Sequence, residues 1–284
     1  MTNPKIIHEP LWIKPLLLSV AGLFFLVFIA LPIVTIFQEA LKSGVVSYLK
    51  TFTDPGVAAA IRLTLLTVAI CVPVNTFFGV FLAWLITKYD FPGKSVLVTL
   101  IEVPFSISPV IAGLLFIFLF GAFGWFGTWL IDHGIKIVFA VPGIVLATLF
   151  VSFPFVAREL TPLMRVLGKD DEEAALTLGA SGFQIFWKIT LPNIKWGLLY
   201  GIILTSARAM GEFGAVAVVS GLIRGVTTTV PLYIEVLYGE YMFKSAFAVA
   251  SLMTFFAFIT IVTKAILEHV IAVQKKSKEV EVHS

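Results

Sequence analysis

The sequence predicts an all-α membrane protein with six transmembrane helices, and three observations lead to this class. Hydrophobic residues make up 59% of the 284 residues and charged residues only 13%. In a typical soluble domain, about a quarter of all residues are charged. The apolar residues gather in repeated runs of roughly 20, the length with which a helix crosses a hydrocarbon core of about 30 Å. None of these runs alternates apolar and polar residues as a barrel strand does, so the spans are expected to be helices.

Six apolar runs follow one another along the chain, after an N-terminal segment 1–15 and before a tail 272–284. We expect the spans at residues 16–37, 61–87, 96–120, 137–157, 194–219 and 245–271. The segment 121–132, GAFGWFGTWLID, is too short to cross a membrane and is rich in glycine and aromatic residues. It is either a short interfacial or re-entrant helix or an ordinary loop.

The basic residues predict the orientation of these spans. An even number of spans places both termini on one side. The connections on that side carry 13 Lys and Arg, against six on the other side, and Arg208 lies within a span. Because cytoplasmic connections carry the excess of Lys and Arg, we expect both termini and the connection 170–192 in the cytoplasm.

Several kinds of chemistry are not supported by the sequence. Cys71 is the single cysteine, so no intrachain disulfide is possible, and the four histidines lie far apart without metal-ligand spacing. No nucleophile and base pattern stands out. A phosphate loop requires G-x-x-x-x-G-K-[ST], but Gly93-Lys94-Ser95 copies only its end and position 88 is Lys. We therefore expect no catalytic residue, metal or cofactor on this chain, and no nucleic-acid partner.

The connection 170–192, DDEEAALTLGASGFQIFWKITLP, predicts two short capped helices. Asp170 is expected to cap the first in a capping box with Glu173, and Gly179 to end it in a left-handed conformation. Ser181 is expected to cap the second, which Pro192 would end. Both helices carry small apolar faces, and such exposed faces need a cover. This connection, called the coupling loop below, therefore predicts a partner.

The coupling loop resembles the EAA loop of ABC importer permeases, E-A-A-x3-G-x9-I-x-L-P. The positions that match are Glu173, Ala174, Ala175, Gly179, Ile189, Leu191 and Pro192. In that family the loop forms coupling helices that sit in a groove on a separate ATP-hydrolysing subunit. The resemblance implies the type I permease fold, contact of these residues with two copies of an ATPase, and ATP and Mg bound on the ATPase.

Ionised residues inside the spans are the second candidate site. Arg208 and Glu212 lie one helical turn apart in the fifth span, where each charge costs about 2.5 to 3.5 kcal/mol on an insertion scale. They either lock the bundle as a pair or belong to the translocation path or its gate. In the third span, Glu102, Pro104 and Pro109 predict a broken helix that lines the path, because proline frees backbone groups that need protein or water.

Three further segments, ARAMGEFGAVAVVSGLIRG, PFSISPVIAG and FPFVARELTPLM, resemble the sulfate and molybdate branch of these permeases, most of all the W-type subunit of sulfate/thiosulfate permeases. The resemblance covers about residues 61–271 and leaves out the termini. It implies sulfate/thiosulfate import across the bacterial inner membrane. The implied partners are a T-type permease subunit as heterodimer mate, the ATPase, a periplasmic sulfate-binding protein and membrane lipid. The loop 222–243, with Arg224, Thr227 to Thr229 and Glu235, would meet the binding protein.

Other functions remain open on the sequence. A molybdate or tungstate permease would carry an oxyanion of nearly the same size. An ion-driven secondary transporter would need no ATPase and leaves the EAA loop unexplained, and a membrane scaffold would not transport at all. The sequence does not separate sulfate, thiosulfate and molybdate, nor a homodimer from a heterodimer, because both arrangements use the same loop.

Overall fold

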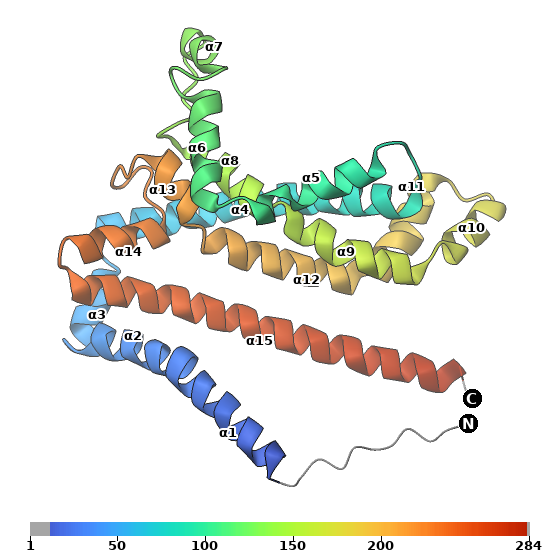
Figure 1. The fold of residues 1–284 in the computed structure, drawn as a ribbon, viewed down its shortest axis with the longest axis horizontal. Coiled ribbons are helices and arrows are strands. Elements are labelled where there is room, and N and C mark those ends of the chain that lie inside the picture. The colour runs from blue at the N-terminus through green and yellow to red at the C-terminus, as the bar shows by residue number, and fades with distance from the viewer. Residues whose placement is uncertain (1–11, 283–284) are drawn as a thin grey trace.

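Helices are the regular secondary structure in the part of the chain that the structure describes, and turns and short loops connect them. The computed structural model describes residues 12–282, with side chains up to residue 268. No strand occurs among the described residues, which confirms the all-α class. Most of the long helices run along one common axis, and the short helices α10 and α11 lie together at one end of this bundle (Figure 1).

The N-terminal elements form a long apolar helix that diverges from the bundle. α1 (Ile13–Phe25), η1 (Leu26–Ala30) and α2 (Leu31–Leu41) follow without a break, and η1 is a wider π turn. α2 packs on the long C-terminal helix α15 (Phe243–Val282), whereas α1 leaves the body of the molecule (Figure 1). A short helix, α3 (Val45–Thr51), leads to the next element.

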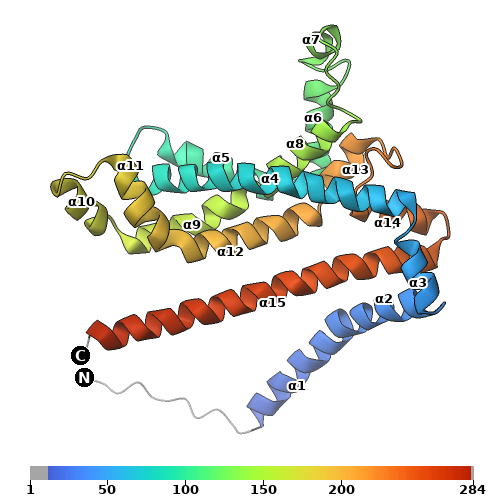
Figure 2. The same cartoon turned by 180° about the vertical axis from the view of Figure 1, so that it is seen from behind.

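The centre of the bundle is built on α4 (Pro55–Lys88), which Figure 2 shows along the length of the molecule. Asp54 caps this helix by accepting hydrogen bonds from the backbone N–H groups of Gly56 and Val57, at 2.7 and 3.2 Å. α4 packs closely on α9 (Pro154–Leu167) and α12 (Leu191–Met210). At Gly79, an added Cβ would stand 2.5 Å from the Cβ of Val156, so the absence of a side chain permits this approach.

Two of the predicted spans are broken helices. α5 (Lys94–Ser106) and α6 (Pro109–Phe120) meet at an angle of 109°, and α12 and α13 (Gly214–Ser220) at 49°. Pro109 begins α6, in agreement with the expectation that proline interrupts the third span. α6 projects sideways and ends in the short helix α7 (Gly127–Asp132), so the segment 121–132 contains a helix (Figure 1).

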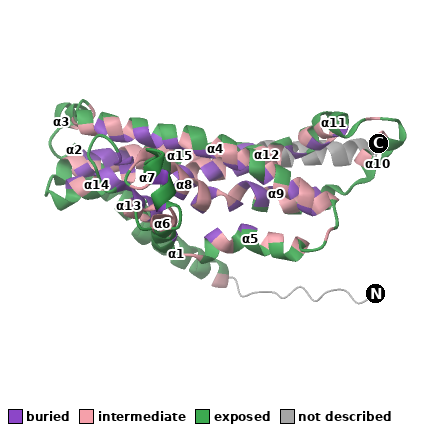
Figure 3. Ribbon diagram, turned by 90° about the horizontal axis from the view of Figure 1, so that it is seen from above, coloured by how far each residue is buried: buried purple, intermediate pink, exposed green. Residues whose placement is uncertain are grey.

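The remaining elements complete the bundle. α8 (Val141–Ser152) packs on α13 and α4, and α14 (Val230–Gly239) packs on α15 at the end opposite α10 (Asp170–Thr177) and α11 (Gly182–Ile185). Four helices are long and apolar enough to cross a membrane unbroken, and the number rises to six if each bent pair is one span. Buried residues concentrate where α4, α8, α9, α12 and α13 meet, while α1 is exposed along its length (Figure 3).

Candidate functional site

The coupling loop begins with α10, whose start differs from the expectation. The residue before the helix is Lys169, which makes no side-chain cap, and Asp170 already belongs to the first turn. Four acidic residues, 170–173, occupy that turn, where the positive end of the helix dipole stabilises them. The capping box predicted for Asp170 and Glu173 is therefore wrong: charge at the helix end, rather than a side-chain cap, favours this start.

The turn between α10 and α11 confirms the two other local predictions. Gly179 has φ +84°, and the N–H groups of Gly179 and Ala180 donate to the carbonyls of Leu176 and Ala175, both at 3.0 Å. This is a Schellman ending, which favours glycine at the left-handed position. Ser181 then caps α11 in a capping box with Gln184: Ser181 N–H donates to Oε1 of Gln184 at 2.9 Å, and Gln184 N–H donates back at 3.4 Å.

The second short helix does not end at Pro192, contrary to the expectation. α11, the π turn η2 (Phe186–Thr190) and α12 form one continuous helical run, and Pro192 lies in the first turn of α12. A wider turn just before a proline accommodates its ring and its missing N–H group. The coupling loop is consequently continuous with a membrane-crossing helix on its C-terminal side.

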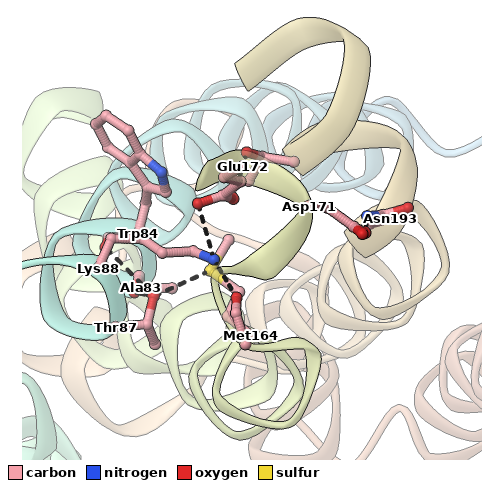
Figure 4. Close-up of polar contacts among 10 residues, drawn as sticks. Ala83, Trp84, Thr87, Lys88, Met164, Asp171, Glu172 and Asn193 are labelled. Carbon is pink, nitrogen blue, oxygen red and sulfur yellow. Dashed lines mark hydrogen bonds and ion pairs between the residues drawn. The ribbon is translucent and has the colours of Figure 1, made fainter. Parts of the chain in front are cut away.

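A buried polar network holds α10 against the bundle (Figure 4). Nζ of Lys88, the last residue of α4, lies 2.9 Å from Oε2 of Glu172 and donates to the carbonyl of Gly168 at 2.6 Å. The other oxygen of Glu172 accepts from the hydroxyl of Thr190 at 2.7 Å. The Lys88 and Glu172 side chains are only 9% and 17% exposed. One carboxylate thus joins α10 to α4 and η2.

The opposite side of the coupling loop carries no cover among the described residues. Glu173 and Ala174 are exposed, Ala175 is partly exposed, and Leu178 and Phe183 are 89% and 74% exposed. This stretch thus exposes both acidic and apolar side chains, and at Phe183 its surface borders an apolar cavity that is also lined by Phe77 and Phe81 of α4. This surface, made by residues 173–183, is called the outer face of the coupling loop.

The last three positions that match the EAA pattern, Ile189, Leu191 and Pro192, lie at the helix bundle and outside the outer face. Ile189 and Leu191 are partly buried: Ile189 lines a small cavity beside Lys88 and Thr190, and Leu191 packs against the cluster that contains Ile194. Pro192 is exposed in the first turn of α12. The structure thus divides the EAA positions between an exposed N-terminal group and an anchoring C-terminal group.

The charged pair lies at the break between α12 and α13. The two side chains are 2.7 Å apart, and Glu212 also accepts a hydrogen bond from the N–H of Ala215 at 2.9 Å, in the first turn of α13. The Glu212 side chain is 2% exposed and that of Arg208 29%. Glu212 therefore holds one edge of the Arg208 guanidinium and the start of the next helix together.

The two broken helices also meet near this pair. A Cβ added at Gly214 would stand 3.0 Å from Cβ of Pro109, so the start of α6 lies directly against the start of α13. Pro104 is buried in α5, whereas Glu102 is exposed and forms no ion pair among the described residues. The structure thus brings Pro109 beside the Arg208 and Glu212 segment, whereas Glu102 has no hydrogen bond or ion pair to any described side chain.

Sequence reasoning missed Lys88, Glu172 and Thr190. Nothing in the sequence connects Lys88 with Glu172, because no local pattern links positions 84 residues apart. Only the packing of α4 beside the start of α10 reveals the pair.

Fold and site together define a class of protein: an integral membrane subunit whose loop offers a surface to a separate partner. Residues 75–272 match the family described as "Binding-protein-dependent transport system inner membrane component", and the chain belongs to this family. It is thus a permease subunit of an inner-membrane importer rather than an enzyme, which confirms the identification made from the EAA loop.

Named relatives agree with this assignment. The chain is 46% identical over 272 residues to the "Sulfate transport system permease protein CysW" of Escherichia coli K12, covering 96% of this chain and 94% of the relative. A protein of the same name from Synechocystis is 47% identical, with 90% and 93% covered. The E. coli protein "CysT" is 36% identical, with 83% and 85% covered.

Solved structures support the fold. A chain of the "bacterial alginate ABC transporter in complex with alginate pentasaccharide-bound periplasmic protein" superimposes with a TM-score of 0.73 at 20% identity, covering 91% of this chain and 93% of that one. At this identity the likeness shows the ABC importer permease fold alone.

Proposed function

We propose that this chain translocates sulfate, and thiosulfate with it, as one permease subunit of an ATP-driven importer. The observation that carries the proposal is the similarity to proteins named CysW, 46–48% identical over nearly the whole chain, which exceeds the 36% identity to CysT. The second permease subunit is then a T-type chain, in a heterodimer.

The substrate explains why an ATPase is needed. A dianion that moves inward against about 100 mV, negative inside, meets about 4.6 kcal/mol before any concentration gradient is counted. Passive entry does not accumulate such an ion. A partner that hydrolyses ATP supplies the work, and a periplasmic sulfate-binding protein supplies the selectivity.

The outer face of the coupling loop is the proposed contact with the ATPase, of which two copies bind ATP and Mg. Leu178 and Phe183 offer apolar area to a groove, and Glu173 offers a carboxylate to a basic residue. With the loop in the cytoplasm, both termini lie there too, as the basic residues predict. The termini themselves are outside the described residues or lack described side chains.

Arg208, Glu212, Glu102, Pro104 and Pro109 are the proposed elements of the translocation path or its gate. In support of this, the Arg208 side chain is 29% exposed although it is paired, whereas Glu212 is almost fully buried. The break between α12 and α13 also leaves backbone groups near the charge, as discontinuous helices do in other transporters.

The loop 222–243 is the proposed contact with the binding protein. Its exposed part is narrower than the sequence implies, because Thr227, Thr228 and Thr229 are buried, and the hydroxyls of Thr227 and Thr228 bond within the loop. Arg224, which pairs with Glu240, and Glu235 are exposed. We therefore place the contact on the 222–226 turn and on Glu235 rather than on the threonines.

Uptake measurements test the proposal. A strain that lacks its own sulfate importers and carries this chain with its partners is expected to accumulate labelled sulfate, with less uptake of labelled molybdate. Uptake of molybdate or tungstate alone would replace the sulfate assignment by that alternative. Accumulation of sulfate in vesicles that lack the ATPase would favour an ion-driven transporter. Membership of the binding-protein-dependent transport family argues against that alternative.

A further inference from the structure

We propose that Lys88, Glu172 and Thr190 form a joint that fixes the coupling loop to the transmembrane helices. In this joint Glu172 is a positioning residue, while the neighbouring Glu173 faces the ATPase. The inference rests on the proposed function, because only a chain that engages an ATPase has a movement to transmit.

The joint connects four segments through one lysine and one carboxylate. Lys88 closes α4, and its Nζ contacts both Glu172 in α10, at 2.9 Å, and the carbonyl of Gly168 just after α9, at 2.6 Å. Glu172 uses its second oxygen for Thr190 in η2, at 2.7 Å. α10 is therefore held from both sides, so a displacement of α10 moves α4 and η2 with it.

Burial makes this ion pair different from the surface pairs of the molecule. Thr190 is 3% exposed, and the two charged side chains are 9% and 17% exposed. The pair Glu39 and Lys42 has the same 2.9 Å separation, but its side chains are 37% and 66% exposed. Water screens an exposed pair, whereas removal of one partner from a shielded pair leaves a charge without compensation. The joint therefore holds its geometry where the surface pair does not.

Apolar packing supports the joint on the membrane side. One turn before Lys88, the Trp84 ring meets Phe186 of η2 edge to face, with centroids 6.1 Å apart. The hydroxyl of Thr87 lies 3.5 Å from Sδ of Met164 in α9. These contacts fix the end of α4 against η2, which carries Thr190, and against α9, which Gly168 follows.

The other end of α4 suggests where a movement at the joint goes. α4 is helical from Pro55 to Lys88, with Pro73 inside it. At its N-terminal end, Tyr233 of α14 donates to Asp54 at 3.3 Å, and the N–H of Val230 donates to Thr64 at 2.9 Å. One helix thus joins the coupling loop to α14, which follows the turn proposed to meet the binding protein.

Uncoupling in the purified complex tests the joint. We expect E172Q and K88Q to retain the ATPase subunits in the wild-type ratio and to hydrolyse ATP without the binding protein at or above the wild-type rate. Sulfate carried per ATP is expected to fall by at least about fivefold. A general folding defect would instead lose the ATPase and hydrolysis together.

The charge exchange K88E/E172K is the decisive variant. It rebuilds the ion pair with exchanged partners but loses the donation to Gly168 and the hydrogen bond from Thr190, and it places a cation in the first turn of α10. We therefore expect a partial recovery, with transport per ATP above that of either single variant. The matched control is E39Q/K42Q, which removes an ion pair of the same length from the surface and is expected to behave as wild type. E173Q is expected to lose bound ATPase, a different defect.

Three results would overturn the joint. These are wild-type transport per ATP in E172Q and K88Q, a charge exchange no better than the single variants, or loss of the ATPase from E172Q as from E173Q. Failure of the proposed function is distinguishable. If the wild-type complex carries no sulfate, the dependence of its hydrolysis on the binding protein still reports whether E172Q and K88Q are uncoupled.

Discussion

At the scale of single residues, burial makes Arg208 and Glu212 interdependent. The Glu212 side chain is almost fully buried and makes two interactions. It pairs with Arg208, and it accepts a hydrogen bond from the N–H of Ala215 at the start of α13. Arg208 is less enclosed and therefore the more available to an anion. A substitution of Arg208 alone thus changes stability as well as any role in transport.

We predict that R208A destabilises the protein by about 3–5 kcal/mol, because it leaves the Glu212 carboxylate buried without a partner. R208A/E212Q is expected to recover most of this loss, since a glutamine still accepts from Ala215. Thermal unfolding in detergent measures the stability of each variant, and uptake of labelled sulfate measures whether the variant still transports. Impaired uptake by the stable double variant would place Arg208 in the path, whereas normal uptake would restrict the pair to packing.

The ion pair of Arg224 and Glu240 predicts a pH dependence at the far end of the molecule. The hydrogen bond that Arg224 donates holds the pKa of Glu240 below its usual value of about 4.5. A lowered pKa contributes stability above pH 4.5 that is lost as the pH falls through the lowered value. Hydrogen exchange of the 221–242 segment is therefore expected to rise at acid pH, by no more than about fivefold because the pair is exposed. E240Q should show little of this rise; an equal rise in E240Q would assign it to other groups.

At the scale of elements, the coupling loop is two short helices around a turn that one glycine permits. Gly179 adopts φ +84°, and a Cβ placed there would meet no atom within 4 Å. The requirement at this position is therefore the backbone conformation and not space. The helix that follows runs into α12 without interruption, so the angle of this turn sets how α10 is presented.

We predict that G179A costs about 1–2 kcal/mol at the turn, that G179V costs more, and that G179N costs less, because asparagine tolerates the left-handed conformation. Retention of the ATPase and sulfate uptake are expected to fall in the order Asn, Ala, Val. G182A is the matched control, because Gly182 has equal space and no positive φ. If G179N were as defective as G179V, the side chain rather than the backbone would be the cause.

Most signals that lie within a few residues of each other were readable from the sequence, although the capping box expected at Asp170 and Glu173 was wrong. The Gly179 stop, the Ser181 cap and the interruption at Pro109 depend on neighbours, and the structure has all three. The direction of the chain after an interruption is not readable, since Pro109 marks a break but not the 109° turn that packing of α6 on α13 imposes. The Lys88 to Glu172 contact and the continuous run through Pro192 depend on tertiary packing for the same reason.

At the scale of the whole molecule, the two ends of the bundle are distinct. One end carries α10, α11 and the joint, and the other carries α3, α14 and the Arg224 turn (Figure 1). The distribution of basic residues predicts that the first end is cytoplasmic. Cys71, the single cysteine, is fully buried, so the native chain offers no accessible thiol that would obscure a labelling experiment.

We predict that a cysteine at Leu178 reacts with an impermeant thiol reagent only after the cells are permeabilised, and that one at Tyr241 reacts in spheroplasts. Both side chains are more than 80% exposed, so burial would not explain a failure to react. The native chain, with Cys71 alone, is expected to stay unlabelled in both conditions. The reverse pattern would invert the orientation.

The adjacent glutamates of α10 also bear on how this loop tolerates change over evolution. Successive residues of a helix point about 100° apart, so Glu172 and Glu173 address different surroundings only while their register is kept. Substitutions at the outer face would tune the fit to a new partner one residue at a time. Insertion or deletion of a single residue before position 172 would instead rotate the helix by about 100° and turn Glu172 away from Lys88. The outer face of such a loop is free to vary in composition, whereas its joint residue Glu172, its turn glycine Gly179 and its length are not.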